Sequence, residues 1–191
     1  MMNNVTPVVL KIIILNVVVF FASSMLPAYI PTLAMYAPGS EGFKPYQIIS
    51  HMFMHGGLGH LLFNMMSLFF LGPYVEKALG EKKFLILYFV SGMAAMATHF
   101  LLSSNPIVGA SGAVYGVLMT FAVLFPDVKL MLLIPPIPVK ARYLAIGLIV
   151  YDLFSGLSQM NTGIAHFAHL GGGFAGLLLA FIWKKNFNRW N

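Results

Sequence analysis

The stretch Val108-Gly109-Ala110-Ser111-Gly112-Ala113-Val114-Tyr115-Gly116 opens an apolar segment that continues to about Phe125. It places one serine hydroxyl among residues with very small side chains, at the point where a hydrophobic helix is expected to begin. A hydroxyl flanked by glycines can be approached closely by another backbone or by a substrate carbonyl. Two interpretations follow: Ser111 is a nucleophile, or it forms a hydrogen bond inside a tight contact between two helices.

The composition indicates the class of protein. Of the 191 residues, 59% are hydrophobic and 8% are charged, whereas soluble domains have about 25% charged residues. We therefore expect an integral membrane protein, with residues 1–191 forming one membrane domain. The chain has no cysteine, which excludes disulfides, thiolate nucleophiles and cysteine metal ligands. The net charge of +6 is explained by membrane topology, so we expect no nucleic-acid partner.

Six apolar segments have about the length needed to cross a bilayer, roughly 20 residues. They cover residues 8–26, 58–78, 84–102, 110–125, 143–157 and 163–183. The predicted fold is an all-α membrane protein, a bundle of six transmembrane helices with a long first external loop. This loop is rich in proline and glycine, so we expect it to be irregular and functional. The first segment lacks a cleavage site and is treated as a retained span rather than a signal peptide.

The basic residues indicate the orientation of the chain in the membrane. If the N-terminus is cytoplasmic, Lys44 alone lies outside, and the other ten of eleven basic residues lie inside, in agreement with the positive-inside bias. Both termini are therefore predicted to be cytoplasmic. Ser111 would then lie at the outer start of the fourth segment, and His169 about six residues, or roughly 9 Å, into the sixth. The ten residues are Lys11, Lys77, Lys82, Lys83, Lys129, Lys140, Arg142, Lys184, Lys185 and Arg189.

Polar side chains gather toward the outer half of this apolar chain. Such groups are rare and costly inside a membrane, so each is a candidate functional residue. A scatter of structural histidines would not need to converge on one side. The candidates are His51, His55, His60, Asn64, His99, Ser111, His166 and His169.

Small residues predict which segments meet. The fourth segment has Gly112 and Gly116 four residues apart, a close-packing pattern. In the sixth segment one helix face carries His169 and three small residues. Two such helices can approach until their backbones nearly touch. The three small residues are Gly173, Gly176 and Ala180.

This approach would bring the Ser111 hydroxyl within reach of the His169 ring, and a serine paired with an imidazole is an activated nucleophile. Tyr115 lies one turn after Ser111 and could pack against that ring. His60 and Asn64 lie one turn apart, and the Ser111 amide is at a helix N-terminus where amides are unpaired. These three groups could bind a developing oxyanion. The alternative for His60 and Asn64 is a hydrogen-bonded pair between helices.

Three motifs in this chain resemble those of the rhomboid intramembrane serine proteases. They are Gly109-Ala110-Ser111-Gly112, His60-Leu61-Leu62-Phe63-Asn64 and Ala168-His169-Leu170-Gly171-Gly172. The resemblance covers nearly the whole chain. It implies a six-span bundle in the cytoplasmic membrane of a bacterium, a Ser111–His169 catalytic dyad, and hydrolysis of transmembrane proteins near the outer membrane boundary. It implies neither a metal nor another cofactor.

The resemblance also assigns supporting roles. His60, Asn64 and the Ser111 amide would form the oxyanion hole. Tyr115 would pack on the histidine, and His51 and His55 would shape a water-filled site. The chain departs from the family in its first loop, where Tyr46-Gln47 replaces the frequent Trp-Arg pair and leaves the anchoring of the loop undefined. Further residues expected to line the site are Gly109, Gly112 and His166.

Other interpretations were weighed against this one. A zinc protease would need a carboxylate near its histidines, and no glutamate lies near them. A transporter usually has internal repeats, which we do not find. An inactive rhomboid-like protein that binds membrane proteins is the third alternative. Asp152 could complete a Ser-His-Asp triad, but counting about ten residues inward from Arg142 places it near mid-membrane, deeper than Ser111 and His169. We therefore expect a structural hydrogen-bonding role for Asp152, and a structural role for His99. The fifth segment, with Phe154 and Leu157 near its outer end, is the expected gate for substrates entering from the lipid.

Overall fold

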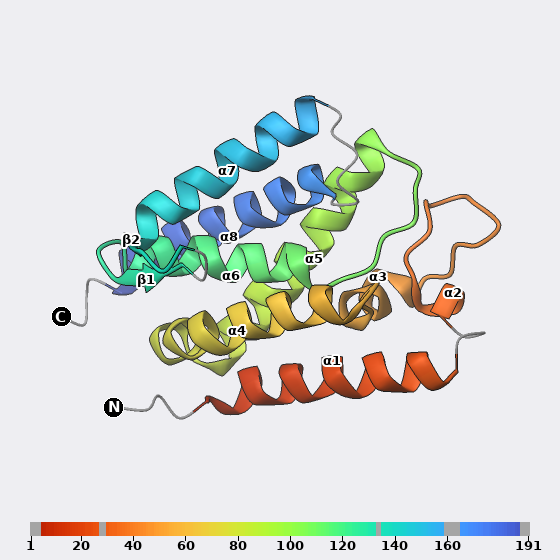
Figure 1. The fold of residues 1–191 in the computed structure, drawn as a ribbon, viewed down its shortest axis with the longest axis horizontal. Helices are drawn as coiled ribbons and strands as arrows, with labels where there is room; N and C mark the ends of the chain where they lie inside the picture. The colour runs from red at the N-terminus through yellow and green to blue at the C-terminus, as the bar shows by residue number, and fades with distance from the viewer. Residues whose placement is uncertain (1–4, 27–29, 133–134, 159–164, 188–191) are drawn as a thin grey trace.

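The structure is a computed structural model that describes residues 5–26, 30–132, 135–158 and 165–187, and helices dominate it (Figure 1). The short helices α2 (Ile30–Leu33), α3 (Gln47–Ser50) and the 3-10 helix η2 (His51–Phe53) lie between α1 and α4. The strands β1 (Lys129–Met131) and β2 (Pro138–Lys140) join α6 to α7. The longer helices are α1 (Pro7–Met25), α4 (Leu58–Leu79), α5 (Glu81–Leu102), α6 (Ser111–Leu124), α7 (Ala141–Leu157) and α8 (His166–Phe187).

Each of the six predicted segments overlaps one of the longer helices over most of its length. In the described part of the chain, α1, α4, α5 and α8 are long and apolar enough to cross a membrane. Helices α6 and α7 have 14 and 17 residues, about 21 and 26 Å at 1.5 Å per residue, which is shorter than the roughly 30 Å hydrocarbon core. The count of six spans therefore stays a prediction. Residue 163, Pro27 and Arg189 lie outside the described residues.

Helix α6 is the centre of the bundle. Apart from half-buried Tyr115, its residues from Gly112 to Ala122 are all buried. A helix that is apolar and buried on every side belongs inside a bundle. In Figure 1, α1 lies beside α4 at one edge and α7 lies beside α8 at the other. The N-terminal end of α6 is thus enclosed by neighbouring helices.

The backbones of α6 and α8 nearly touch, as the sequence predicted. A methyl group added at Gly176 would lie 2.5 Å from Cα of Gly116 and 2.8 Å from its carbonyl carbon. Gly172 makes the same kind of contact with the carbonyl group of Gly112. Gly173 of the predicted face also meets α6, through the side chains of Met119 and Tyr115, but the backbone contact is made by Gly172. The contact therefore uses glycines four residues apart on both helices, and the two helices run parallel.

A buried carboxylate attaches α1 to the bundle. Glu76, near the end of α4, is 3% exposed. It accepts hydrogen bonds from Thr6 Oγ1 at 2.5 Å, Val9 N at 2.9 Å and Val8 N at 3.2 Å. The first N–H groups of a helix have no partner within the helix and carry partial positive charge. Glu76 therefore caps α1 from another helix.

The first loop is anchored by Gln47, which is 1% exposed. Its side-chain Nε2 donates to the carbonyl groups of Gly42 at 3.0 Å and Thr32 at 3.1 Å, and its Oε1 accepts from the Lys44 amide at 3.0 Å. Tyr46 is 52% exposed. The glutamine at the position where the chain departs from the family pattern thus ties together segments of the loop through backbone groups.

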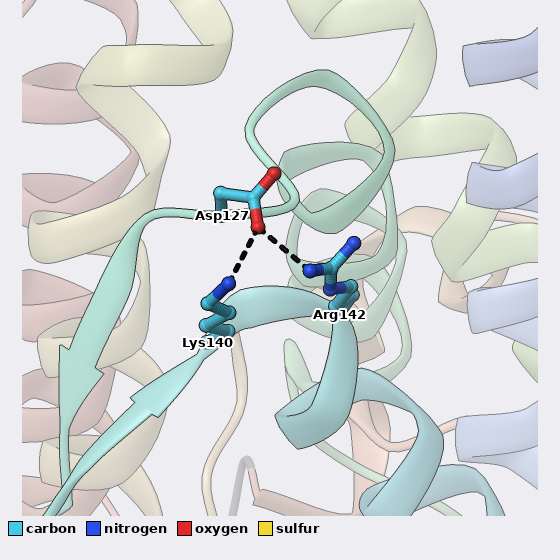
Figure 2. Close-up of polar contacts among 3 residues, drawn as sticks. All are labelled: Asp127, Lys140 and Arg142. Carbon is cyan, nitrogen blue, oxygen red and sulfur yellow. Dashed lines mark hydrogen bonds and ion pairs between the residues drawn. The ribbon is translucent and has the colours of Figure 1, made fainter.

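The hairpin of β1 and β2 was not predicted, because each strand has only three residues. Its strands pair antiparallel, with Lys129 opposite Lys140. At its base, Asp127 Oδ1 accepts from Lys140 Nζ at 3.0 Å and from Arg142 Nη2 at 2.8 Å (Figure 2). The hydrogen bond from Lys140, together with the charge of Arg142, lowers the pKa of the Asp127 carboxyl. This carboxylate offsets part of the basic charge at this end of the protein.

Replacing Gly176 with alanine should destabilise the bundle, because the new methyl group would overlap backbone atoms that cannot move aside. Overpacking of this kind costs about 1–3 kcal/mol. Gly147→Ala in α7 is the matched control, since a methyl group there meets no atom within 4 Å. The midpoint of thermal unfolding in detergent micelles should fall for Gly176→Ala and stay constant or rise for Gly147→Ala. Equal midpoints for both variants would contradict the packing.

Replacing Glu76 with glutamine should loosen α1, because the new amide group cannot accept all three hydrogen bonds. We expect a loss of about 1–3 kcal/mol, the usual cost of leaving buried polar groups unpaired. Glu81→Gln, at the exposed start of α5, is the control. Limited proteolysis in micelles should cleave near α1 faster in Glu76→Gln than in Glu81→Gln, and identical cleavage rates would refute this role for Glu76.

Candidate functional site

The segment before Ser111 is held by the first loop. Ile107 and Met35 exchange two backbone hydrogen bonds of 3.0 Å each, and the Gly109 amide donates to the carbonyl of His51 at 2.9 Å. Gly109 has a φ of +127°, a conformation that residues with a side chain rarely adopt. The chain therefore enters α6 along a fixed path, and Ser111 is the first residue of that helix.

His60 lies against this same segment. A methyl group added at Gly109 would be 2.6 Å from Cε1 and 2.8 Å from Nε2 of the His60 ring, and 3.8 Å from the Ser111 amide nitrogen. The first amides of a helix have no partner within it, and the helix dipole adds positive potential there. The ring of His60 and the Ser111 amide nitrogen thus both lie close to the position that a side chain on Gly109 would occupy.

Asn64 is buried one turn after His60 in α4. Its Nδ2 donates to the carbonyl of His60 at 2.9 Å. This bond lies within α4, whereas the alternative interpretation expected a hydrogen bond between helices. A side-chain amide carries two N–H groups, and this bond uses one of them. The ring of His55 lies beside the ring of His60, with the two centroids 4.9 Å apart.

His51 and His55 precede α4 and are buried. His51 Nδ1 is 2.7 Å from the carbonyl of Gln47. Burial lowers the pKa of His51, and burial together with the charge of His60 lowers the pKa of His55 to about 4. Both rings are therefore neutral near pH 7. His51 supports the backbone before Ser111, a role that the sequence did not predict.

His169 lies in the first turn of α8, because this helix begins at His166. The sequence predicted that His169 lies about six residues into this segment, because the segment was expected to begin at residue 163. In the structure His169 is three residues after the first residue of the helix. The Tyr115 ring is stacked on the His169 ring, with centroids 4.3 Å apart and planes 17° apart. This is the contact expected from the sequence. Ser111 and Tyr115 are four residues apart and share one face of α6.

Asp152 contacts both histidines of α8. Its Oδ1 is 2.6 Å from His166 Nδ1 and 3.3 Å from His169 Nδ1. The prediction that Asp152 lies deeper than Ser111 and His169 was wrong, because its carboxylate contacts His169 itself. Asp152 is about ten residues from Arg142 but only five residues before the C-terminal end of α7 at Leu157. Counting from that end places it level with His169.

His99 is not part of this group. Its Nε2 is 2.8 Å from the carbonyl of Asn105, so it supports the loop between α5 and α6, in keeping with the expected structural role. Among the described residues, no group of three or more histidine and carboxylate side chains is arranged to hold a metal ion.

Phe154 and Leu157, which the sequence placed at the expected gate, are 66% and 69% exposed. Their side chains therefore do not form a packed contact between α7 and a neighbouring helix.

The chain was compared with known proteins. The family model described as the Rhomboid domain matches residues 42–186. A putative rhomboid protease of Bacillus subtilis, YdcA, is 32% identical over 92% of this chain and 88% of its own length. The rhomboid protease GlpG of Klebsiella pneumoniae is 29% identical over 94% of this chain and 64% of its own length. RHOMBOID-like protein 4 of Arabidopsis thaliana is 32% identical over 75% of this chain and 34% of its own length.

The chain thus spans most of the Bacillus relative and a smaller part of the other two. Its apolar helices, in the described part of the chain, are those of a membrane protein. The family match covers most of the sequence and includes Ser111, His60 and His169. The chain therefore belongs to the rhomboid family, among relatives named as rhomboid proteases.

Proposed function

We propose that this protein is an intramembrane serine endopeptidase that cleaves transmembrane helices near the outer membrane boundary. Ser111 is the nucleophile and His169 is the general base and acid. The six longer helices are six spans of one membrane domain, and both termini lie on the cytoplasmic side of a bacterial inner membrane. The membrane proteins that serve as substrates reach the site through the bilayer.

One observation carries this proposal: the stacking of Tyr115 on His169. Ser111 shares the face of α6 from which Tyr115 reaches the histidine. The glycine contacts between α6 and α8 start at Gly112, the next residue after Ser111. A face that presents both a hydroxyl and the ring that supports the histidine favours a Ser111–His169 pair over a purely structural serine.

The reaction follows from these roles. The Ser111 oxygen bonds to the scissile carbonyl carbon while its proton moves to Nε2 of His169, and the peptide C–N bond breaks as that proton passes to the leaving amine. Water then hydrolyses the acyl-enzyme. The negative oxygen of the intermediate is bound by the Ser111 amide, His60 and Asn64. The position of the His60 ring beside Gly109 and the Ser111 amide supports this assignment.

Water reaches the site from the outer face, past His55 and His60. Polar groups concentrate at this end of an otherwise apolar protein, and neutral imidazoles can hydrogen-bond water without a buried charge. His51, His166, Gly109 and Gly112 complete the surroundings of the site.

Substrates must expose a peptide bond that a transmembrane helix keeps in internal hydrogen bonds. The segment to be cleaved should therefore contain Gly, Pro or β-branched residues, which weaken a helix. The residue that donates the scissile carbonyl should be small, because Gly109 and Gly112 leave little space beside Ser111. Helix α7, with Phe154 exposed near its outer end, is the element past which substrates enter.

Ser111→Ala and His169→Asn should each abolish proteolysis, and the double variant should be little worse, because members of one catalytic unit are strongly non-additive. A fluorophosphonate probe should label the wild type and Ser104→Ala, an exposed serine control, but not Ser111→Ala. Cleavage of a model transmembrane helix in liposomes gives the second measurement. Labelling that persists in Ser111→Ala would refute the proposal, and a wild type that neither labels nor cleaves would favour an inactive binding protein.

His60→Ala and Asn64→Ala should lower turnover by roughly 10- to 1000-fold, the range for removal of an oxyanion donor. The loss should fall on kcat and not on KM, because the oxyanion exists only in the transition state. Asn105→Ala, at an exposed asparagine, is the control and should keep full activity. A change confined to KM would assign His60 and Asn64 to substrate binding instead.

A further inference from the structure

The Asp152 carboxylate is almost completely buried, with 1% of its surface exposed. Its Oδ1 receives both histidine contacts of α8, while Oδ2 has no hydrogen-bond partner within the described residues. A buried carboxylate is costly unless its charge is compensated. If Asp152 only held α7 and α8 together, its 2.6 Å contact with His166 would be sufficient. The additional contact with His169 therefore calls for its own explanation.

We propose that Asp152 is a positioning residue that holds the His169 proton on Nδ1, which leaves Nε2 free to accept the proton of Ser111. This inference rests on the proposed function. Neutral imidazole carries its proton on one nitrogen, and the nitrogen that faces a carboxylate is the one that keeps it. The contact with Asp152 is made by Nδ1, so the geometry selects the tautomer that a general base needs.

The same contact acts during the reaction. When the Ser111 O–H bond breaks, the proton forms a new bond to Nε2, and His169 becomes an imidazolium ion. Its positive charge then lies beside the negative charge of Asp152, in a site that water screens poorly. Asp152 stays ionised throughout, and the proton leaves again on the amine of the product. The carboxylate thus stabilises the charged intermediate without touching the substrate.

His166 fixes the carboxylate in turn. It is 4% exposed, and its Nδ1 makes the shorter of the two contacts with Asp152. The ring of Tyr151 packs against the His166 ring, with centroids 5.7 Å apart. His166 therefore orients Asp152, although the sequence suggested that it lines the site. The titratable groups that face His169 come from four helices: His60 of α4, Tyr115 of α6, Asp152 of α7 and His166 of α8.

The tautomer can be measured without any proteolysis. In detergent-solubilised full-length protein labelled with ¹⁵N-histidine, the signals of His169 are identified by their loss in His169→Asn. We expect an Nδ1-protonated ring in the wild type and in Ser111→Ala. In Asp152→Asn the ring should shift toward the Nε2-protonated form. A wild-type His169 that carries its proton on Nε2 would overturn the inference, even if Asp152→Asn failed to fold.

Kinetics give the second test. Asp152→Asn should lower kcat by roughly 10- to 1000-fold with little change in KM. Asp127→Asn removes an exposed carboxylate and should change neither kcat nor KM. Asp152→Glu should retain more activity than Asp152→Asn.

The outcomes separate the two proposals. If the wild type cleaves substrate and Asp152→Asn keeps both its kcat and the His169 tautomer of the wild type, this inference fails and the proposed function stands. A purely structural role for Asp152 would lower the fraction of folded protein and leave the kcat of the remaining folded enzyme unchanged. If the wild type neither cleaves nor labels, but its His169 tautomer depends on Asp152, the proposed function fails and the positioning role stands.

Discussion

The backbone contact between α6 and α8 is the interaction on which the rest of the site depends. In a bilayer, apolar surfaces gain little by leaving the lipid, so helices associate through close packing and hydrogen bonds. Gly112 against Gly172 and Gly116 against Gly176 allow an approach that any side chain would prevent. Thr120 Oγ1 adds a hydrogen bond to the carbonyl of Gly176 at 3.1 Å. Because the glycines pair in parallel register, Ser111 lies level with Gly171, two residues after His169.

Local patterns explain why much of this could be predicted from the sequence. The six apolar segments set the positions of the longer helices to within a few residues. The four-residue spacing of Gly112 and Gly116 indicated a close helix contact, and the four-residue spacing of Ser111 and Tyr115 indicated a shared face. The contact of Tyr115 with His169 follows from these two patterns together. The predicted face included Gly173, which contacts side chains of α6, but it left out Gly172, which contacts the backbone of α6, because one helix face is broad enough to present both.

The interactions that the sequence did not reveal depend on the path of the chain in space. Glu76 caps a helix that begins almost seventy residues earlier, and no periodic pattern connects the two. Gln47 satisfies backbone groups whose positions depend on the path of the loop. Asp152 was placed too deep because its depth was measured from the wrong end of a short helix. Each of these side chains is buried and hydrogen-bonded to groups that the sequence pattern does not connect to it, and such pairing becomes visible only in three dimensions.

The position of His169 on α8 has a consequence for biosynthesis. Helices are made in the order of the sequence, so Ser111 and the loop contacts around it are synthesised before Asp152, and Asp152 before His169. Under the proposed function, the growing chain carries a nucleophile with no base until α8 enters the membrane. A membrane peptidase is surrounded by possible substrates from the moment of insertion. With His169 as that base, its place on a late helix keeps the unfinished chain inert toward its neighbours.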